Sequence, residues 1–262
     1  MARKLSLSLL ALPLIACAAD AHEQPKPTAS AQSAEKVSGV LTLEGYDAIR
    51  LSGCDKATVR RGASFAVTVR GTERDLALLE AETRGTRLVL DRKKGGCKDG
   101  YVPIAIGITL PALREVELSG ATRMAIERFS GPRFEAKLSG ASELDLTGLE
   151  IGDGELHLSG ASELRATSIM ADIVTLDLSG AAEANIAGSA KVVAIGSSGA
   201  SEADTRDLLA PQVTATASGN ASIRAHASRT AALSASGVSS IRVTGGATCT
   251  LSKGGQAHTA CD

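Results

Sequence analysis

Aromatic residues are scarce in this chain, which has 262 residues but only two tyrosines, three phenylalanines and no tryptophan. Aromatic rings commonly stack on nucleic-acid bases and sugar rings, so the sequence offers few platforms for either ligand. An excess of charge of one sign is also lacking, because the formal net charge is −1. Proteins that bind nucleic acid usually carry a basic patch. We therefore expect no nucleic-acid partner.

Catalytic and metal-binding motifs are missing as well. The chain has no Gly-x-Ser-x-Gly elbow and no Cys-x-x-Cys pair, and its four histidines do not follow a metal-ligand spacing. The sequence therefore predicts no catalytic residue, no metal and no cofactor.

The N-terminus is typical of an export signal. Arg3 and Lys4 precede an apolar run, residues 5–15, that is too short to cross a bilayer as a helix. We predict a signal peptide over residues 1–21. The following residues 22–36 contain two prolines and no apolar residue larger than alanine, so they predict a flexible linker.

Two cleavage sites compete within this signal. The stretch LIAC, Leu14–Cys17, resembles the lipobox of bacterial lipoproteins, in which the cysteine is acylated and becomes the first residue of the mature chain. The stretch Ala19–Ala21 suits an ordinary signal peptidase instead. Five cysteines are an odd number for an exported protein, and assigning Cys17 to a lipid anchor leaves four that can pair. We predict lipidation of Cys17 and an outer-membrane lipoprotein, with a soluble periplasmic or secreted protein as the alternative.

A repeat organises the second half of the chain. The glycine of a Ser-Gly pair recurs every 18 to 20 residues, at Gly120, Gly140, Gly160, Gly180, Gly199, Gly219 and Gly237. Four and two positions before each glycine the residues are mostly apolar, and the residue between them is mostly polar. The same alternation follows the glycine. A period of two predicts strands with one buried face, so each unit contributes two short strands that flank a tight Ser-Gly-Ala corner.

Short strands at this period, with no room for a helix between them, predict an all-β fold: a single-stranded parallel β-helix, or β-solenoid, with about 20 residues per coil. Leucine-rich repeats do not fit, because alanine takes the place of their asparagine, and a propeller needs a period of about forty residues or more. Equivalent residues of successive coils stack about 4.8 Å apart. The repeated serine, glycine and alanine are therefore architectural.

Glutamates recur three positions after the corner glycine, at Glu143, Glu163, Glu183 and Glu202. They predict a column of four carboxylates at coil spacing, which is a candidate cation site. The alternative is a polar shoulder that keeps the edge soluble, since each exposed pair of like charges costs only on the order of 1 kcal/mol. We favour the shoulder, because no aspartate-rich loop supplies the other ligands that calcium usually takes.

Residues 37–110 have strand patterns without the strict period and predict β layers that cap the solenoid, which covers residues 111–262. A cap is required because an open end coil presents unpaired backbone to other chains.

The four remaining cysteines fall at the two ends of this arrangement. Cys54 and Cys97 lie in the cap region, and Cys249 and Cys261 lie in the C-terminal tail. We predict one disulfide within each pair, which staples the end coils. A cross-pairing would have to join the two ends of the solenoid.

The order of these motifs resembles a known family. The segments AIRLSGCDKATVRRG, TRGTRLVLDRK and VPIAIGITLPALREVELSGATRMAI, followed by LSGASEL coils, are similar to the bacterial "putative autotransporter adhesin, head GIN domain" family over most of residues 41–254. The most specific piece is ITLPALREVELSGAT. The resemblance implies export and a right-handed β-helix, and it implies no catalytic residue. Nothing after Gly254 is typical of a membrane β-barrel or a trimerising coiled coil, so we expect lipid anchoring in place of self-export.

Together these patterns predict a noncatalytic cell-envelope protein that binds or adheres to an unknown surface, polymer or protein, and that meets the membrane only through its lipid anchor. One alternative is a polysaccharide-active β-helix enzyme, for which Asp145, Asp177 and Asp204, with His157 and Arg165 nearby, are the available polar residues. The other is a self-assembling envelope spacer, which would need a large apolar face.

Overall fold

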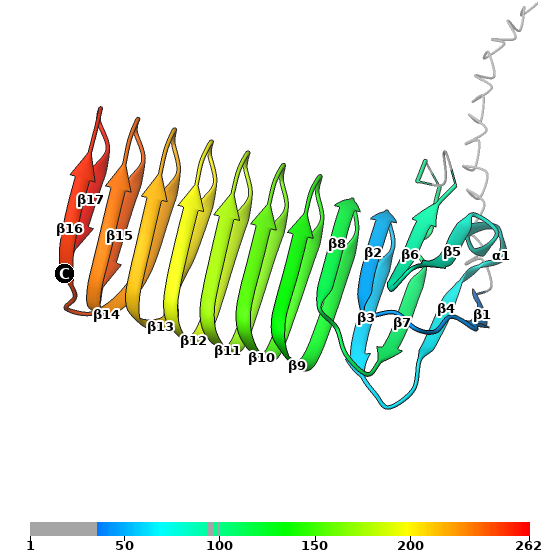
Figure 1. Cartoon of the computed structure of the whole chain (residues 1–262). Helices are drawn as coiled ribbons and strands as arrows, with labels where there is room; N and C mark the ends of the chain where they lie inside the picture. The colour runs from blue at the N-terminus through cyan, green and yellow to red at the C-terminus, as the bar shows by residue number, and fades with distance from the viewer. Residues whose placement is uncertain (1–35, 94–96, 99) are drawn as a thin grey trace, which may run out of the picture. The chain divides into compact units, whose positions relative to one another are not determined.

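The computed structural model describes residues 36–93, 97–98 and 100–262, which form a β-solenoid of about 7 turns with one short helix (Figure 1). The coils consist of β8 (Glu115–Gly120), β9 (Arg123–Leu138), β10 (Glu143–Leu158), β11 (Glu163–Leu178), β12 (Glu183–Ser197), β13 (Glu202–Ala217), β14 (Ser222–Ala235), β15 (Ser240–Thr244), β16 (Thr248–Lys253) and β17 (His258–Cys261). The all-β solenoid predicted from the sequence is confirmed.

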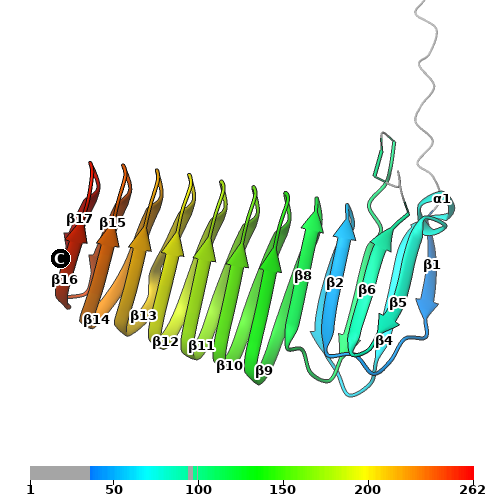
Figure 2. The ribbon, with the colours of Figure 1, turned by 45° about the horizontal axis from the view of Figure 1, so that its top comes forward.

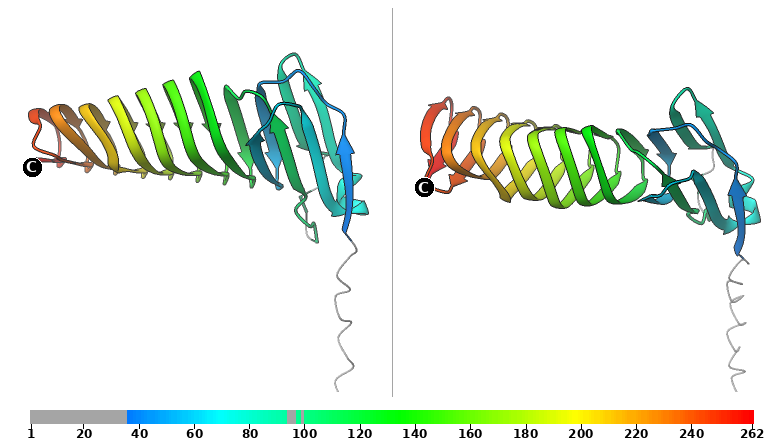
Figure 3. Two further views of the ribbon diagram at one scale, coloured as in Figure 1. Left: turned by 90° about the horizontal axis from the view of Figure 1, so that it is seen from below. Right: turned by 60° about the horizontal axis from the view of Figure 1, so that its bottom comes forward.

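Successive coils pair in parallel, with a register offset of 20 residues from β9 through β11. Leu144 lies beside Leu164 and Leu156 beside Leu176, and all four are buried inside the coils. Figure 3 shows these turns stacked one on the next. The core is therefore a set of apolar columns that run along the solenoid.

Each coil differs in one respect from the expected pair of short strands. A single strand of 14 to 16 residues runs between consecutive corners from β9 to β14. In β9, β10 and β11 this strand bends near its middle, where Arg128, Gly148 and Ser168 have φ values of 55°, 70° and 57°. This left-handed bend has no constant residue type, so no periodic pattern of residues predicts it.

The Ser-Gly-Ala corners require glycine on two counts. Gly160 has a φ of +76°, and a Cβ atom there would lie 2.8 Å from the carbonyl oxygen of Gly140 in the preceding coil. The backbones of successive coils are in direct contact at these stacked corners, because the Ala161 amide donates to the same Gly140 oxygen at 2.8 Å. Glycine is the residue that permits both the turn and the stacking.

The N-terminal layers are partly interleaved with the coils. They comprise β1 (Lys36–Leu41), β2 (Ala48–Gly53), β3 (Lys56–Arg61), β4 (Ala66–Thr72), α1 (Glu73–Leu76), β5 (Leu79–Arg84), β6 (Arg87–Arg92) and β7 (Ala105–Leu110). Strand β2 lies between β6 and β8 (Figure 2), and β3 pairs with both β7 and β9. Gly53 stands in register with Gly120, so it belongs to the same glycine ladder. Beyond this coil β4 pairs antiparallel with β7 and β1, and β5 pairs antiparallel with β6.

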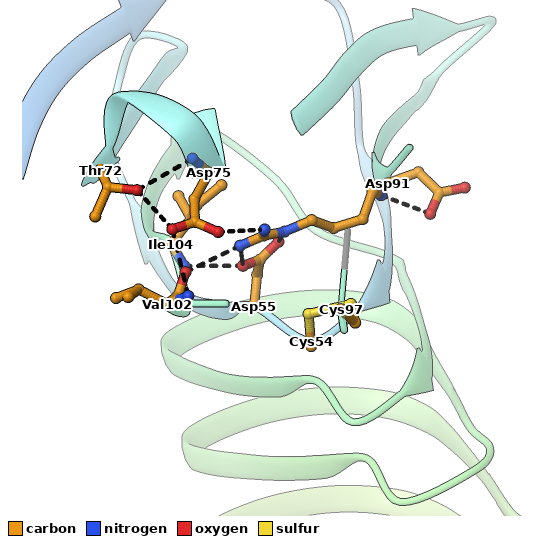
Figure 4. A network of polar contacts seen from close by, with 9 residues as sticks. Cys54, Asp55, Thr72, Asp75, Asp91, Cys97, Val102 and Ile104 are labelled. Carbon is orange, nitrogen blue, oxygen red and sulfur yellow. Dashed lines mark hydrogen bonds and ion pairs between the residues drawn. A yellow bond between two sulfur atoms is a disulfide. The ribbon is translucent and has the colours of Figure 1, made fainter. Parts of the chain in front are cut away.

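A buried ion cluster holds these layers together (Figure 4). Arg92 donates from Nε and Nη2 to the two carboxylate oxygens of Asp55 at 2.8 and 2.6 Å, and from Nη1 to Asp75 at 3.0 Å. All three side chains are at most 4% exposed. The backbone amide of Ile104 also donates to Asp55, at 2.8 Å. The cluster thereby connects β6, α1 and the segments that flank β3 and β7.

The same contacts set the ionisation of Asp75, which forms the first turn of α1. Burial raises the pKa of Asp75, but hydrogen bonds from Thr72, Arg92 and the Val102 amide, together with the charge of Arg92, outweigh burial and lower it below 3.8. The hydrogen bond to Asp55 raises the pKa of Arg92 further. Asp75 and Arg92 are therefore both charged at neutral pH.

Disulfides lie at both ends of the described residues, where Cys54 is bonded to Cys97 and Cys249 to Cys261. No helix among the described residues has the length and hydropathy needed to cross a membrane. The predicted signal peptide, Cys17 and residues 22–35 of the predicted linker lie outside those residues, whereas Lys36, the last residue of that linker, is the first residue of β1 and so is not part of a flexible segment.

Candidate functional site

A groove of about 590 Å³ runs along one face of the coils, just before the glycine corners. It crosses six coils, from β8 to β13, which at the usual strand spacing is a length of about 24 Å. Two outward columns line it, three positions and one position before each corner glycine: Glu117, Lys137, His157, Asp177, Gly196 and Thr216 in the first, and Ser139, Ser159, Ser179, Ser198 and Ser218 in the second.

The serine column gives the groove a row of hydroxyl groups. Ser139, Ser159 and Ser179 each donate to the carbonyl oxygen of a leucine in the preceding coil, at 3.3, 3.2 and 3.4 Å. A hydroxyl that donates in this way keeps its lone pairs as acceptors. The groove therefore offers one fixed acceptor per coil at a constant spacing.

The other column is charged at one end and neutral at the other. Glu117 lies 3.6 Å from both Arg50 and Arg87, and the His157 Nδ1 atom lies 3.4 Å from Asp177. In the next coil Gly196 has no side chain, and a Cβ atom there would lie 2.7 Å from the Asp177 Oδ1 atom. The Asp177 carboxylate therefore lies over Gly196, where this column has no side chain of its own.

Lys137 sits between these charges and is held by two acids. Its Nζ atom lies 2.6 Å from Glu135 and 4.0 Å from Glu115. The hydrogen bond to Glu135 raises the pKa of Lys137. It is therefore an ammonium at neutral pH, suited to hold an anionic group rather than to accept a proton.

The glutamate column predicted as a cation site or polar shoulder lies after the corners, outside this groove. Its members stand in register in four successive coils: Glu143, Glu163, Glu183 and Glu202. Three of them form ion pairs with arginines, namely Arg123, Arg165 and Arg224. The fourth accepts from the Asn185 amide at 3.0 Å. These partners compensate the negative charges of the column, as we expect for a solvated polar shoulder.

The aspartates considered for polysaccharide cleavage are not brought together. Asp145 and Asp204 occupy one column three coils apart, a separation of about 14 Å, with Arg165 and Asn185 between them. Asp177 belongs instead to the groove. Glycosidases hold their two carboxylates about 5 to 10 Å apart across the substrate. This trio does not have that arrangement.

Sequence reasoning identified the polar columns but not the groove. The signal for the serine row was visible, because a serine precedes every corner glycine from Gly120 to Gly237. From the sequence alone, that serine is predicted to serve only the corner. The structure places its hydroxyl at the groove floor as well.

Comparisons with known proteins agree with the fold. Residues 45–247 match the family described as "Putative auto-transporter adhesin, head GIN domain". A "putative adhesin" from Parabacteroides merdae ATCC 43184 is 17% identical with a TM-score of 0.81, covering 88% of this chain and 97% of its own. A "putative lipid binding protein" from Parabacteroides distasonis ATCC 8503 is 17% identical with a TM-score of 0.80, covering 88% and 98%. A "putative adhesin" from the same organism is 18% identical with a TM-score of 0.76, covering 87% and 98%. No curated protein matches the chain.

Proposed function

Because the chain belongs to the family described as "Putative auto-transporter adhesin, head GIN domain", we propose that it is a noncatalytic adhesion domain whose groove binds an extended polar polymer. The family and its adhesin neighbours favour a non-enzymatic role, and the disulfides fit an exported protein. The groove of this chain, and not its family or its structural neighbours, suggests the polymer as the ligand.

The observation that carries the proposal is the regular hydroxyl row. A polymer with a repeating polar group can meet one serine after another, so that many weak contacts add along the groove. Hydroxyl rows need no bulky anchor, which agrees with the shortage of aromatic residues in the chain. The charged end, with Lys137, adds a contact for an anionic group.

Binding to an array of immobilised polysaccharides and polypeptides tests this proposal. Ser159→Leu and Ser179→Leu fill the groove with apolar side chains and should abolish the wild-type signal. Ser189→Leu is the matched control, because Ser189 is an exposed serine of β12 that does not line the groove. Loss in the first two variants with unchanged melting temperature supports the groove. Equal binding by all three variants would place adhesion elsewhere, and the absence of any binding would reject the function.

We also propose that Cys17 anchors this domain to the outer membrane through a lipid, with residues 22–35 as the tether that leads into β1. The two disulfides use four of the five cysteines, which leaves Cys17 available for acylation. Intact mass of the membrane-fraction protein is the test, with Cys17→Ala for comparison. A mass increase of an acylated cysteine that disappears in the variant supports the anchor, whereas a mature chain that starts at His22 refutes it.

A further inference from the structure

Three metal-ligand side chains converge on the face that carries the groove. Glu135 and Glu155 lie side by side in β9 and β10, and His157 follows two residues later on the same face of β10. One possible ligand atom from each of the three lies within 4.8 Å of the others. Residues two apart in a strand point to the same side, and neighbouring coils bring the third, so the backbone itself sets this cluster.

The histidine is also oriented from behind. The Asp177 carboxylate, in the next coil, lies 3.4 Å from the His157 Nδ1 atom. A carboxylate this close to Nδ1 is placed to accept the Nδ1 proton once Nε2 binds a metal. Metal-binding histidines almost always have such a partner on their other nitrogen. The contact involves a fourth residue, outside the three-residue cluster, and it too is typical of a metal-binding histidine.

We propose that Glu135, Glu155 and His157 form a site for a divalent transition metal such as Zn²⁺, with Asp177 as the positioning residue for the imidazole. One imidazole nitrogen and two carboxylate oxygens suit Zn²⁺, which takes histidine and carboxylate ligands in four-coordinate sites. Calcium is disfavoured because it binds oxygen ligands and takes six to eight of them. The fourth position faces solvent, where water or a group of a bound partner completes the coordination.

Two cations compete with the metal. Lys137 lies 2.6 Å from Glu135, and Arg133 donates to Glu155 at 2.7 Å. Both cations are about half exposed, and Lys137 has a second acid, Glu115, 4.0 Å away. The Lys137 and Arg133 side chains can therefore move away from the two glutamates at a modest cost in free energy. Because of that cost, the site binds metal more weakly than a dedicated structural zinc site.

Calorimetric titration of the full chain with ZnCl₂ tests the proposal, after any affinity tag has been removed. We expect one equivalent of Zn²⁺ to bind to the wild type. His157→Ala should abolish binding, and Asp177→Asn should weaken it by about 10- to 100-fold, the usual effect of losing a histidine's orienting carboxylate. Lys137→Gln should tighten binding, because it removes the competing cation. His226→Ala is the matched control, since His226 lies outside the cluster.

A spectroscopic measurement separates ligation from a structural effect. The electron paramagnetic resonance spectrum of the Cu²⁺-loaded protein should show nitrogen coupling from one imidazole, which His157→Ala removes and His226→Ala keeps. No Zn²⁺ binding to the wild type, unchanged binding by His157→Ala, or weaker binding by Lys137→Gln would each overturn the site. These titrations contain no polymer, so their outcome is separate from that of the adhesion proposal.

Discussion

Replacing Gly160 by alanine measures how strongly the corner ladder constrains the fold. The residue has a φ of +76°, and the new Cβ would lie 2.8 Å from the oxygen, 3.1 Å from the nitrogen and 3.4 Å from the Cα of Gly140. These contacts are all to backbone, which is held by the hydrogen bonds of two coils. The strain therefore has no flexible side chain into which it can relax.

The expected loss has two parts. A left-handed conformation costs a non-glycine residue about 1–2 kcal/mol. Forcing an extra carbon into a packed site typically costs about 1–3 kcal/mol more. The free energy of unfolding should thus fall by about 2–5 kcal/mol, which in a domain of this size lowers the melting temperature by roughly 5–15 °C.

Gly131→Ala is the matched control within the same solenoid. Gly131 is not left-handed, and the nearest atom to its added Cβ is the Arg133 carbonyl oxygen at 3.9 Å. Its effect should stay within about 0.5 kcal/mol of the wild type. Thermal unfolding followed by far-ultraviolet circular dichroism compares the two variants. If Gly160→Ala melts no lower than Gly131→Ala, the close approach between coils is not what selects glycine.

Three other perturbations address the cap. Tyr46 is 2% exposed and its hydroxyl has no hydrogen-bond partner among the described residues, so Tyr46→Phe should raise the free energy of unfolding by about 1 kcal/mol in urea titrations at neutral pH. Burial raises the pKa of Tyr46 from 10.0 to about 12. The wild-type free energy of unfolding should therefore be independent of this group below pH 10 and should fall as the pH rises from 10 toward 12. Tyr46→Phe should abolish that fall. Arg92→Met leaves Asp55 and Asp75 buried without their cation and should cost about 3–5 kcal/mol by the same titration. Joint replacement of Cys54 and Cys97 by serine opens a link across 43 residues and should cost about 4 kcal/mol.

Each of these has a contrary outcome. A destabilised Tyr46→Phe would mean that the hydroxyl is hydrogen-bonded in solution, and a variant that keeps the wild-type alkaline profile between pH 10 and 12 would mean that groups other than Tyr46 cause the alkaline loss. An Arg92→Met protein as stable as the wild type would mean that hydrophobic packing replaces the ion cluster. A cysteine-free cap that unfolds at the wild-type urea concentration would show that the disulfide adds nothing to folding.

Local alternation was enough to predict the solenoid, because each buried position of one coil is repeated in the next. Leu144 and Leu164 illustrate this, since they are 20 residues apart in sequence and neighbours in the core. The bends at Arg128, Gly148 and Ser168 could not be predicted, because side chains of three different kinds adopt one backbone conformation there. Periodicity reports burial, and it does not report the angle at which two arms of a coil meet.

The site was less predictable than the fold. Whether a polar column forms a flat face or a groove depends on the orientation of the corner relative to the sheet. The sequence pattern does not encode that orientation. The partners of His157 illustrate the same limit, because Glu135 and Asp177 lie in different coils on either side of it. The ion cluster of Arg92 joins residues 17 and 37 positions away outside any repeat, so no spacing rule identifies it.

The interleaved cap has a consequence for the order in which the chain folds. Strand β3 pairs with β9 through residues 67 positions apart, such as Lys56 and Arg123, whereas later coils close over 20 residues. Closing the longer loop costs about 1 kcal/mol more in chain entropy. A chain synthesised from its N-terminus presents β2 and β3 early, but their neighbours β8 and β9 follow only after the whole of β4 to β7. Until then, the edge of β2 and β3 that pairs with β8 and β9 has no partner. Once β8 and β9 have paired there, each further coil can pair with a completed coil by closing a loop of about 20 residues.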